Sequence, residues 1–383
     1  MLRHIKRSVE GQPGRRFRTP LAAVLTTRGV AAAAALAAAL VVALTLSGCE
    51  ELFFEPEPGT TPTEIFDQVW NFVDEEYSFF DYKNIDWQAQ RETYESQVSD
   101  HMSDEALFEV LSDMLFQLRD GHVNLVSGFD QSRNWQWYLE EPPNYDYSVL
   151  LREYLENQHQ YVGPFLVHEF RDPGAPDSEA VGYVHYRSFG SAVSPDDMSY
   201  IIEEFADYKG LIIDVRGNGG GASGNVSAIA NRLTDRRVLV AYSQRKNGPG
   251  HDEFTEPTGV YLQPPSGAST YTKPIVVLTN RMCYSATNMF VAYVKSLDHV
   301  TVIGRRTGGG GGTPAYTLLS NNWQLRVSAT RRFLPDRGTG LSLRERNIEG
   351  GVDPDIVEES PESELGAGTD RILETAISYV EAL

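Results

Sequence analysis

Residues 274–289 read PIVVLTNRMCYSATNM and set the frame for the rest of the chain. The apolar, β-branched run at 275–279 predicts a buried strand, and the polar turn after it leads into a helix that begins near Ser285. A serine at such a junction can be a nucleophile, because the first N–H groups of a helix are free to hold a developing negative charge. The alternative is that Ser285 only caps the helix.

Strand and helix patterns alternate on both sides of this stretch, from residue 181 to about 305. Strands are expected at 182–189, 210–213, 238–242 and 275–279, and helices at 194–208 and 225–233. Such alternation predicts a mostly parallel sheet covered on both faces, which is an α/β fold. We assign residues 181–383 to this core.

The segment before the core divides into two parts. Apolar residues at helical spacing predict helices near 65–73, 87–98 and 103–118, so residues 63–120 form a small helical unit. Residues 121–180 are expected to be connecting strands and loops, with strands near 149–154 and 165–170.

The N-terminus reads as an export signal. Seven basic residues precede an apolar, alanine-rich run, and the sequence LSGC at 46–49 resembles the lipobox of bacterial lipoproteins, in which the cysteine carries the lipid. We therefore predict a lipoprotein signal peptide at 1–48, lipidation at Cys49 and a tether at 49–62; a plain transmembrane anchor is the alternative. Cys283, the second of the two cysteines, is then left to act as a small packing residue.

The chain is strongly acidic, with a formal net charge of −20. Removing residues 1–48 takes away seven basic residues and one acidic residue, which leaves a charge of −26 on the remainder. Such a surface repels nucleic acid and anionic lipid, so membrane association would depend on the lipid anchor. The histidines show no HxxxH or Cys/His spacing, and no metal site is expected.

Three further stretches carry candidate site residues. DVRGNGGG at 214–221 follows a buried strand, and its glycines allow backbone N–H groups to approach a ligand; it lacks the Lys and Ser/Thr of a phosphate loop. His122 follows Gly121 at the end of a predicted helix, where it can point into a cleft. Glu349 precedes a glycine pair in IEGGVDPD at 348–355.

Six motifs in order carry a family resemblance: DGHV, the GYVHYRSF strand, DVRGNGGG, YSATN, IGRRTGG and IEGGVDPD. The chain resembles the tail-specific, or carboxy-terminal processing, serine peptidases over about residues 60–380, and in detail their tricorn-like branch. The resemblance implies a crotonase-like αββ core, no cofactor, and protein or peptide substrates.

The resemblance also implies roles for individual residues. Ser285 matches the nucleophile, His122 the general base and Glu349 the carboxylate that orients the histidine. The lysine branch of the family places its base 25 residues after the serine, where this chain has Gly310. An imidazole beside a serine hydroxyl, with a carboxylate to fix its tautomer, is a chemically sufficient set.

The oxyanion donors and the proton relay are expected at nearby positions. For the oxyanion hole, the glycine pattern and the resemblance point to the backbone N–H groups of Gly220, Gly219 and Ala286. Tricorn has a serine directly before its histidine, whereas this chain has Gly121, so Glu349 reaches His122 directly, through water or through another hydroxyl.

The sequence therefore predicts an extracytoplasmic, lipid-anchored serine peptidase of a bacterial cell envelope. It would cleave unfolded tails or peptides through an acyl-enzyme. Residues 127–181 are too few for an inserted peptide-binding PDZ domain, so none is expected. Two alternatives stay open: a catalytically silent peptide- or hydrophobic-ligand-binding protein of the same fold, and an esterase, although no GxSxG motif surrounds Ser285. The oligomeric state is left open.

Overall fold

The computed structural model describes residues 59–135 and 141–383, which belong to one compact unit that begins at Gly59. The predicted signal peptide, Cys49 and most of the tether lie outside the described residues. In the part that is described, no helix has both the length and the apolar character needed to cross a bilayer.

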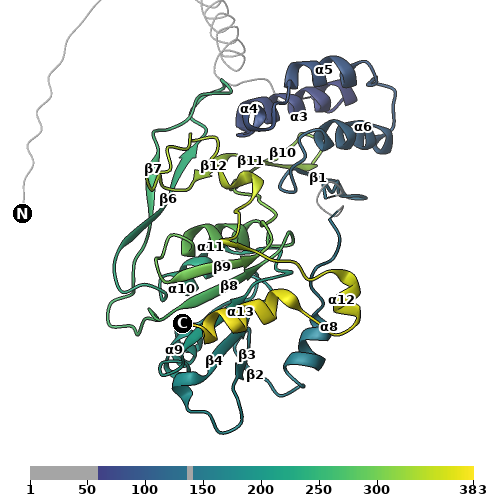
Figure 1. Ribbon diagram of the computed structural model, residues 1–383. Helices are drawn as coiled ribbons and strands as arrows, with labels where there is room; N and C mark the ends of the chain where they lie inside the picture. Colours follow the sequence, from purple (N-terminus) through teal and green to yellow (C-terminus); the bar gives the residue numbers. More distant parts are fainter. Residues whose placement is uncertain (1–58, 136–140) are drawn as a thin grey trace, which may run out of the picture. The chain divides into compact units, whose positions relative to one another are not determined.

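A seven-stranded sheet with the order β13-β9-β8-β5-β4-β3-β2 forms the core (Figure 1). Its five strands from β13 to β4 are parallel, whereas β3 and β2 add to the edge in antiparallel pairing. The fold class is therefore α/β, as predicted. The strands are β2 (Gln160–Val162), β3 (Phe165–Phe170), β4 (Val181–His185), β5 (Gly210–Asp214), β8 (Ile275–Thr279), β9 (Val300–Gly304) and β13 (Ile356–Val357).

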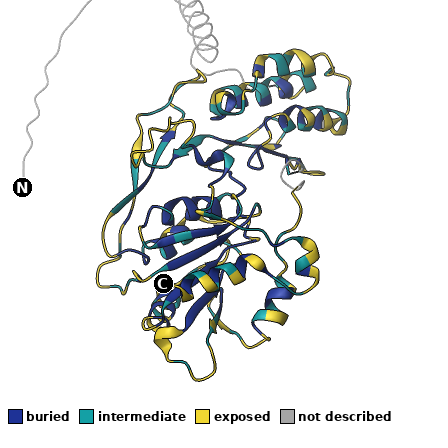
Figure 2. Cartoon of the chain, viewed as in Figure 1, coloured by how far each residue is buried: buried dark blue, intermediate teal, exposed yellow. Residues whose placement is uncertain are grey.

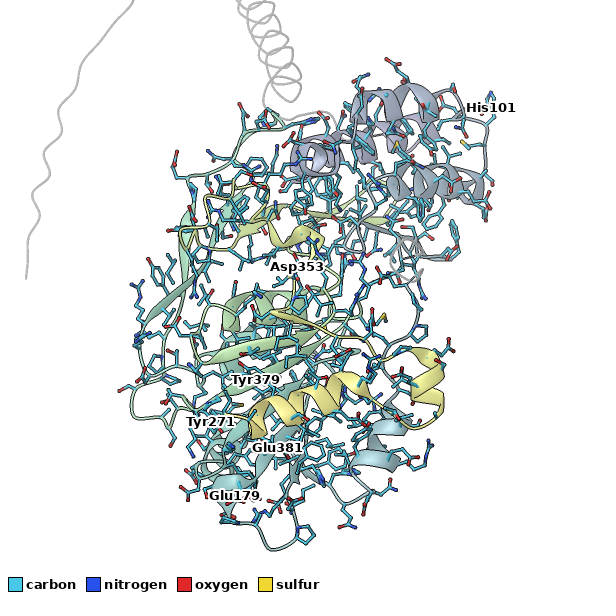
Figure 3. All side chains as sticks on the ribbon, viewed as in Figure 1. His101, Glu179, Tyr271, Asp353, Tyr379 and Glu381 are labelled. Atoms are coloured by element: carbon cyan, nitrogen blue, oxygen red, sulfur yellow. The ribbon has the colours of Figure 1, made fainter. Side chains whose placement is uncertain are left out.

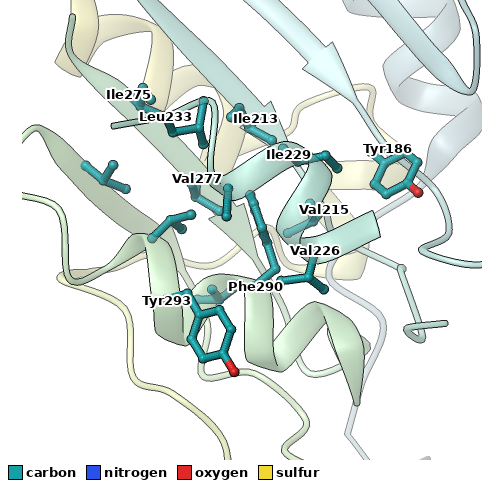
Figure 4. Close-up of a cluster of buried hydrophobic side chains, with 14 of the residues drawn as sticks. Tyr186, Ile213, Val215, Val226, Ile229, Leu233, Ile275, Val277, Phe290 and Tyr293 are labelled. Carbon is teal, nitrogen blue, oxygen red and sulfur yellow. The ribbon is translucent and has the colours of Figure 1, made fainter. Parts of the chain in front are cut away.

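Neighbouring residues of a strand point to opposite faces of the sheet. Both faces of this sheet are covered by hydrophobic clusters. Ile213 and Val277 pack with Phe290 in one large cluster (Figure 4), whereas Ile212 and Val276 belong to a cluster on the other side. The first cluster includes residues of α9 (Pro195–Glu204), α10 (Ser223–Ala230) and α11 (Ala286–Val294), and the second includes α13 (Arg371–Glu381). The central strands are consequently buried throughout (Figure 2).

The N-terminal helices form the predicted helical unit and share a hydrophobic cluster with a second sheet. Leu325 and Val327 of that sheet pack among the apolar side chains of the helices. The sheet has the antiparallel order β1-β11-β10. The elements are α3 (Pro62–Glu76), α4 (Phe80–Lys83), α5 (Trp87–Glu95), α6 (Asp104–Phe116), β1 (Asn124–Val126), β10 (Pro314–Leu318) and β11 (Gln324–Ser328).

A third antiparallel sheet corrects one prediction. The strand expected at 238–242 is β6 (Val238–Arg245), but it pairs with β7 (Thr258–Leu262) and β12 (Thr330–Phe333) rather than with the parallel sheet. The burial pattern explains the difference, since β6 is buried only in part whereas β5 and β8 are buried at every position. Strand alternation in sequence did not distinguish the two sheets.

The strand predicted at 149–154 is also wrong, because the segment is helical. Tyr147–Val149 forms α8 and Leu150–Tyr154 continues it as a π-helix, η1. The Asp146 side chain accepts hydrogen bonds from the N–H groups of Ser148 and Val149, which starts the helix. The remaining short helices are η2 (Asp177–Glu179), η3 (Ile348–Gly350) and α12 (Glu362–Gly366).

Candidate active site

Adjacent parallel strands bring the glycine-rich loop and Ser285 to the same edge of the sheet. β5 ends at Asp214 and β8 at Thr279, and these strands pair in parallel register. The Tyr284 N–H donates to the Asn218 carbonyl oxygen at 3.2 Å, which ties the two loops together. This is the edge at which ligands bind in open α/β sheets.

Ser285 occupies a strained backbone position directly before α11. Its φ is 56° and its ψ is −116°, in a region that costs a non-glycine residue on the order of 1–3 kcal/mol. The side chain makes no capping hydrogen bond to the helix; its Oγ lies 2.8 Å from the Nε2 of His122. The observed contact therefore differs from the one that a helix-capping serine would make.

His122 reaches Ser285 from the connection between α6 and β1, 163 residues earlier in the chain. Its backbone N–H donates to Asp120 Oδ1 at 2.8 Å, and its carbonyl accepts from Arg326 Nε at 2.8 Å. Burial lowers the pKa of His122 to about 4, although the Asp120 carboxylate partly opposes that shift. The imidazole is thus neutral at physiological pH, as a proton acceptor must be.

Glu349 is hydrogen-bonded to the glycine segment, residues 308–312, in which the Gly309 carbonyl oxygen accepts from the Ser285 N–H. Its Oε2 accepts from the Gly311 N–H at 2.9 Å, and its Oε1 lies 2.8 Å from Lys83 Nζ. Within the described residues, no hydrogen bond joins the Glu349 carboxylate to His122, on whose pKa a backbone hydrogen bond with Gly312 acts instead. The direct contact between Glu349 and His122, one of the three expected ways for Glu349 to orient the imidazole, is therefore not observed.

Lys83 and Asp120 are two members of this cluster that sequence reasoning missed. Lys83 Nζ lies between the two carboxylates, 3.4 Å from Asp120 Oδ2, and all three side chains are nearly or fully buried. Burial raises the pKa of Glu349 to about 7, with Lys83 opposing the shift and Asp120 adding to it. The DGH motif contained a signal for Asp120, but Lys83 follows an aromatic cluster and carried none.

Tyr284 lies directly against the position that a side chain at residue 121 would take. A Cβ on Gly121 would be 3.0 Å from the Tyr284 hydroxyl oxygen, and the rings of His122 and Tyr284 are 5.2 Å apart. The tyrosine is 1% exposed. A buried hydroxyl thus accompanies His122 even though residue 121 is glycine.

The expected oxyanion donors differ in how they are bonded. Among the described residues, the N–H groups of Ala286 and Gly219 have no hydrogen-bond acceptor, whereas the Gly220 N–H donates to Asn218 Oδ1 at 3.0 Å. Gly220 nevertheless packs closely against Ser285. Ala286 and Gly219 are therefore the donors left available in this conformation.

Replacing Gly220 with alanine is expected to slow the reaction of Ser285 with a fluorophosphonate by at least about 100-fold. Gly220 has a φ of +104°, and an added Cβ would lie 2.7 Å from the Tyr284 carbonyl oxygen and 2.8 Å from Ser285 Cβ. Gly224→Ala in α10 is the control, since a Cβ there has no neighbour within 4 Å. Equal labelling rates for both variants would contradict this packing argument.

The labelling rate of Ser285 should also persist to unusually low pH. A protonated imidazole cannot accept the serine proton, so reactivity is lost as the pH falls through the pKa of His122, which is about 4. Labelling rates measured from pH 3.5 to 9, with circular dichroism to confirm the fold, would show this midpoint. A midpoint at or above 6.5 would mean that the imidazole is not desolvated as the structure indicates.

Other polar groups of the glycine-rich loop have structural partners. Arg216 is fully buried with Asp214 and Asp370, at 2.7 and 2.8 Å, and this triad anchors the start of the loop.

His101, by contrast, is exposed in the connection between α5 and α6 (Figure 3). Within residues 59–135 and 141–383, no group of His, Cys, Asp and Glu side chains could hold a metal ion.

Comparisons with known proteins place relatives over most of the described chain. The sequence model described as peptidase family S41 matches residues 180–358, and that of the tricorn protease C1 domain matches residues 58–116. The chain is 29% identical over 205 residues to the tricorn protease of Thermoplasma volcanium, which covers 53% of this chain and 17% of that protein. It is 28% identical over 187 residues to the chloroplastic C-terminal processing peptidase of Tetradesmus obliquus. That alignment covers 48% of this chain and 36% of that protein.

A solved structure extends the similarity over most of the chain. The putative peptidase from Parabacteroides merdae is 38% identical, with a TM-score of 0.75, and the alignment covers 84% of this chain and 97% of that one. The curated relatives are longer proteins, of which this chain matches between 17% and 36%.

Proposed function

Because the chain belongs to peptidase family S41, we propose that it is a serine peptidase that cleaves unfolded tails or peptides. The observation that carries the proposal is the 2.8 Å separation of Ser285 Oγ and His122 Nε2 at a strained turn before a helix. A binding protein of the same fold would have no need of this pairing or of its strain.

The proposed reaction uses the residues in a fixed order. Ser285 Oγ attacks the peptide carbonyl carbon while its proton passes to His122 Nε2. The carbon–nitrogen bond then breaks, and the imidazolium returns that proton to the leaving amine. Water, deprotonated by His122, hydrolyses the acyl-enzyme and frees Ser285.

Backbone donors would hold the oxyanion of each tetrahedral intermediate. The N–H groups of Ala286 and Gly219 are available for this, and removing one such donor costs about 100- to 1,000-fold in turnover. The Gly220 N–H would join them only after leaving Asn218.

A fluorophosphonate probe tests the activity directly. The purified full chain should be labelled near neutral pH at Ser285, as shown by mass spectrometry of the modified peptide, and should cleave an unfolded protein such as reduced casein. Ser285→Ala should do neither. A wild-type protein that is not labelled but still binds peptides would instead support the ligand-binding alternative. A protein that is labelled and hydrolyses an ester but cleaves no peptide would support the esterase.

We further propose that the enzyme is anchored by lipid at Cys49 and acts in a bacterial cell envelope. The support is the basic and apolar N-terminal segment that ends in LSGC. Mass spectrometry of the membrane fraction should find a mature N-terminus at Cys49 carrying acyl chains, and Cys49→Ser should release the protein from that fraction. An unmodified N-terminus upstream of Cys49 would exclude lipidation.

A further inference from the structure

A small cavity of about 120 Å³ opens directly beside the Ser285 side chain. Ser285, Ala286 and Met289 line one side of it, so it adjoins both the proposed nucleophile and an oxyanion donor. Its other walls are largely small or apolar. The remaining lining residues are Gly221, Ser223, Gly310, Gly311, Gly312, Thr313, Pro314 and Arg332.

Arg332 is the single charged side chain in this lining. It lies on β12, and its guanidinium donates from Nη1 to the Gly311 carbonyl oxygen at 2.7 Å and from Nη2 to Thr313 Oγ1 at 2.8 Å. These bonds hold the planar group against the cavity wall. They use only part of the five N–H donors of a guanidinium.

No anion neutralises Arg332 in the described structure. Across residues 59–135 and 141–383, no carboxylate oxygen lies within 4.0 Å of its guanidinium, and its buried Nε has no hydrogen-bond acceptor. Lys83, by contrast, has two carboxylate partners. An unneutralised guanidinium in a partly desolvated cavity suits a carboxylate that arrives with a ligand, since the two can pair bidentately.

We propose that this cavity takes an acidic side chain, Asp or Glu, from the substrate residue whose carbonyl is attacked, here called the acyl residue. The inference rests on the proposed peptidase function. The cavity is lined by Ser285 and Ala286, so a side chain on the attacked residue itself can enter it. The apolar walls at Met289 and Pro314 would contact its methylene groups, and Arg332 would pair with its carboxylate.

Peptidyl diphenyl phosphonates test this inference, because the side chain next to phosphorus is by construction that of the acyl residue. Ser285 Oγ forms a bond to phosphorus as phenol leaves, so labelling rates compare side chains directly. With reagents that differ only in Glu, Gln, Leu or Lys, the wild-type full chain should react about 10- to 100-fold faster with Glu than with its isostere Gln, and slowest with Lys.

Variants separate recognition from support of the loop. Arg332→Gln should bring the Glu-to-Gln rate ratio close to one, and Arg332→Lys, which keeps the charge but loses the fork, should give an intermediate ratio. Arg331→Gln is the matched control and should keep the wild-type ratio. Arg331 is the neighbouring residue on β12, stacks on Phe254 and donates to Gln244. If Arg332 only braced Gly311 and Thr313, its loss would slow all four reagents alike and leave the ratio unchanged.

The outcomes also separate this inference from the proposed function. A wild-type protein that reacts with a simple fluorophosphonate but labels as fast with Gln or Leu as with Glu overturns the role of Arg332 and leaves the peptidase proposal standing. If Ser285 reacts with neither class of reagent, both proposals fail. The wild-type ratio decides the matter even if an Arg332 variant does not fold.

Discussion

Replacing His122 with alanine is expected to slow acylation of Ser285 by about four to six orders of magnitude. The Ser285 hydroxyl has one imidazole within hydrogen-bonding distance, at 2.8 Å, and no other base contacts it among the described residues. Without that base, the hydroxyl must lose its proton to water. Burst kinetics with an activated ester and fluorophosphonate labelling would both report the loss.

The matched control is His168→Ala. His168 is partly exposed on β3, with its Nδ1 2.7 Å from the Gln158 carbonyl oxygen, far in sequence from every candidate site residue. That variant should label at the wild-type rate. Added imidazole should restore part of the His122→Ala rate, because the cavity left by the side chain faces Ser285. A His122→Ala protein that is folded and labels within tenfold of wild type would exclude His122 as the base.

The parts of the fold that were predicted correctly are those in which burial dominates the sequence pattern. The apolar runs at 210–213 and 275–279 fall in the strands β5 and β8, in which every residue is buried. The order of motifs then located Ser285 and His122, which the structure brings together. Spacing along the chain could not by itself show that residues 163 positions apart make contact.

The parts that were missed depend on contacts that sequence patterns do not encode. Nothing near Lys83 indicated that it would be buried between Asp120 and Glu349, since the partners come from distant segments. The helical segment 147–154 is too short to show a helical period, so the sequence pattern predicts a strand at 149–154. The displaced strand β6 shows that alternation predicts the presence of strands better than their pairing.

Replacing Lys83 with methionine is expected to lower the free energy of unfolding by about 3–5 kcal/mol at pH 8, because two buried carboxylates lose their cation. The Asp120 side chain is 0% exposed and that of Glu349 is 3% exposed. The deficit should shrink as the pH falls, since one carboxylate can then take up a proton. Urea unfolding at pH 8 and pH 5 would measure both effects.

A surface pair provides the control for that measurement. Lys295 also bonds a carboxylate, that of Asp355, but the two side chains are 24% and 41% exposed, so Lys295→Met should cost no more than about 1 kcal/mol. Adding Glu349→Gln to Lys83→Met should recover part of the lost stability, because it removes one of the two buried carboxylate charges that no longer have a cation beside them. Equal losses for Lys83→Met and Lys295→Met would show that the buried cluster does not depend on its cation.

Glu349→Gln alone then separates two roles for the carboxylate. The Gly311 N–H bond can be kept by an amide oxygen, and the main chain of Glu349 still accepts from Gly310, so the segment behind Ser285 keeps its shape. What is lost is the negative charge. If that charge stabilises the His122 imidazolium through an intervening hydroxyl such as Tyr284, turnover should fall while stability is retained. Full peptidase activity in Glu349→Gln would limit Glu349 to bracing the loop and leave Asp120 as the carboxylate that acts on His122.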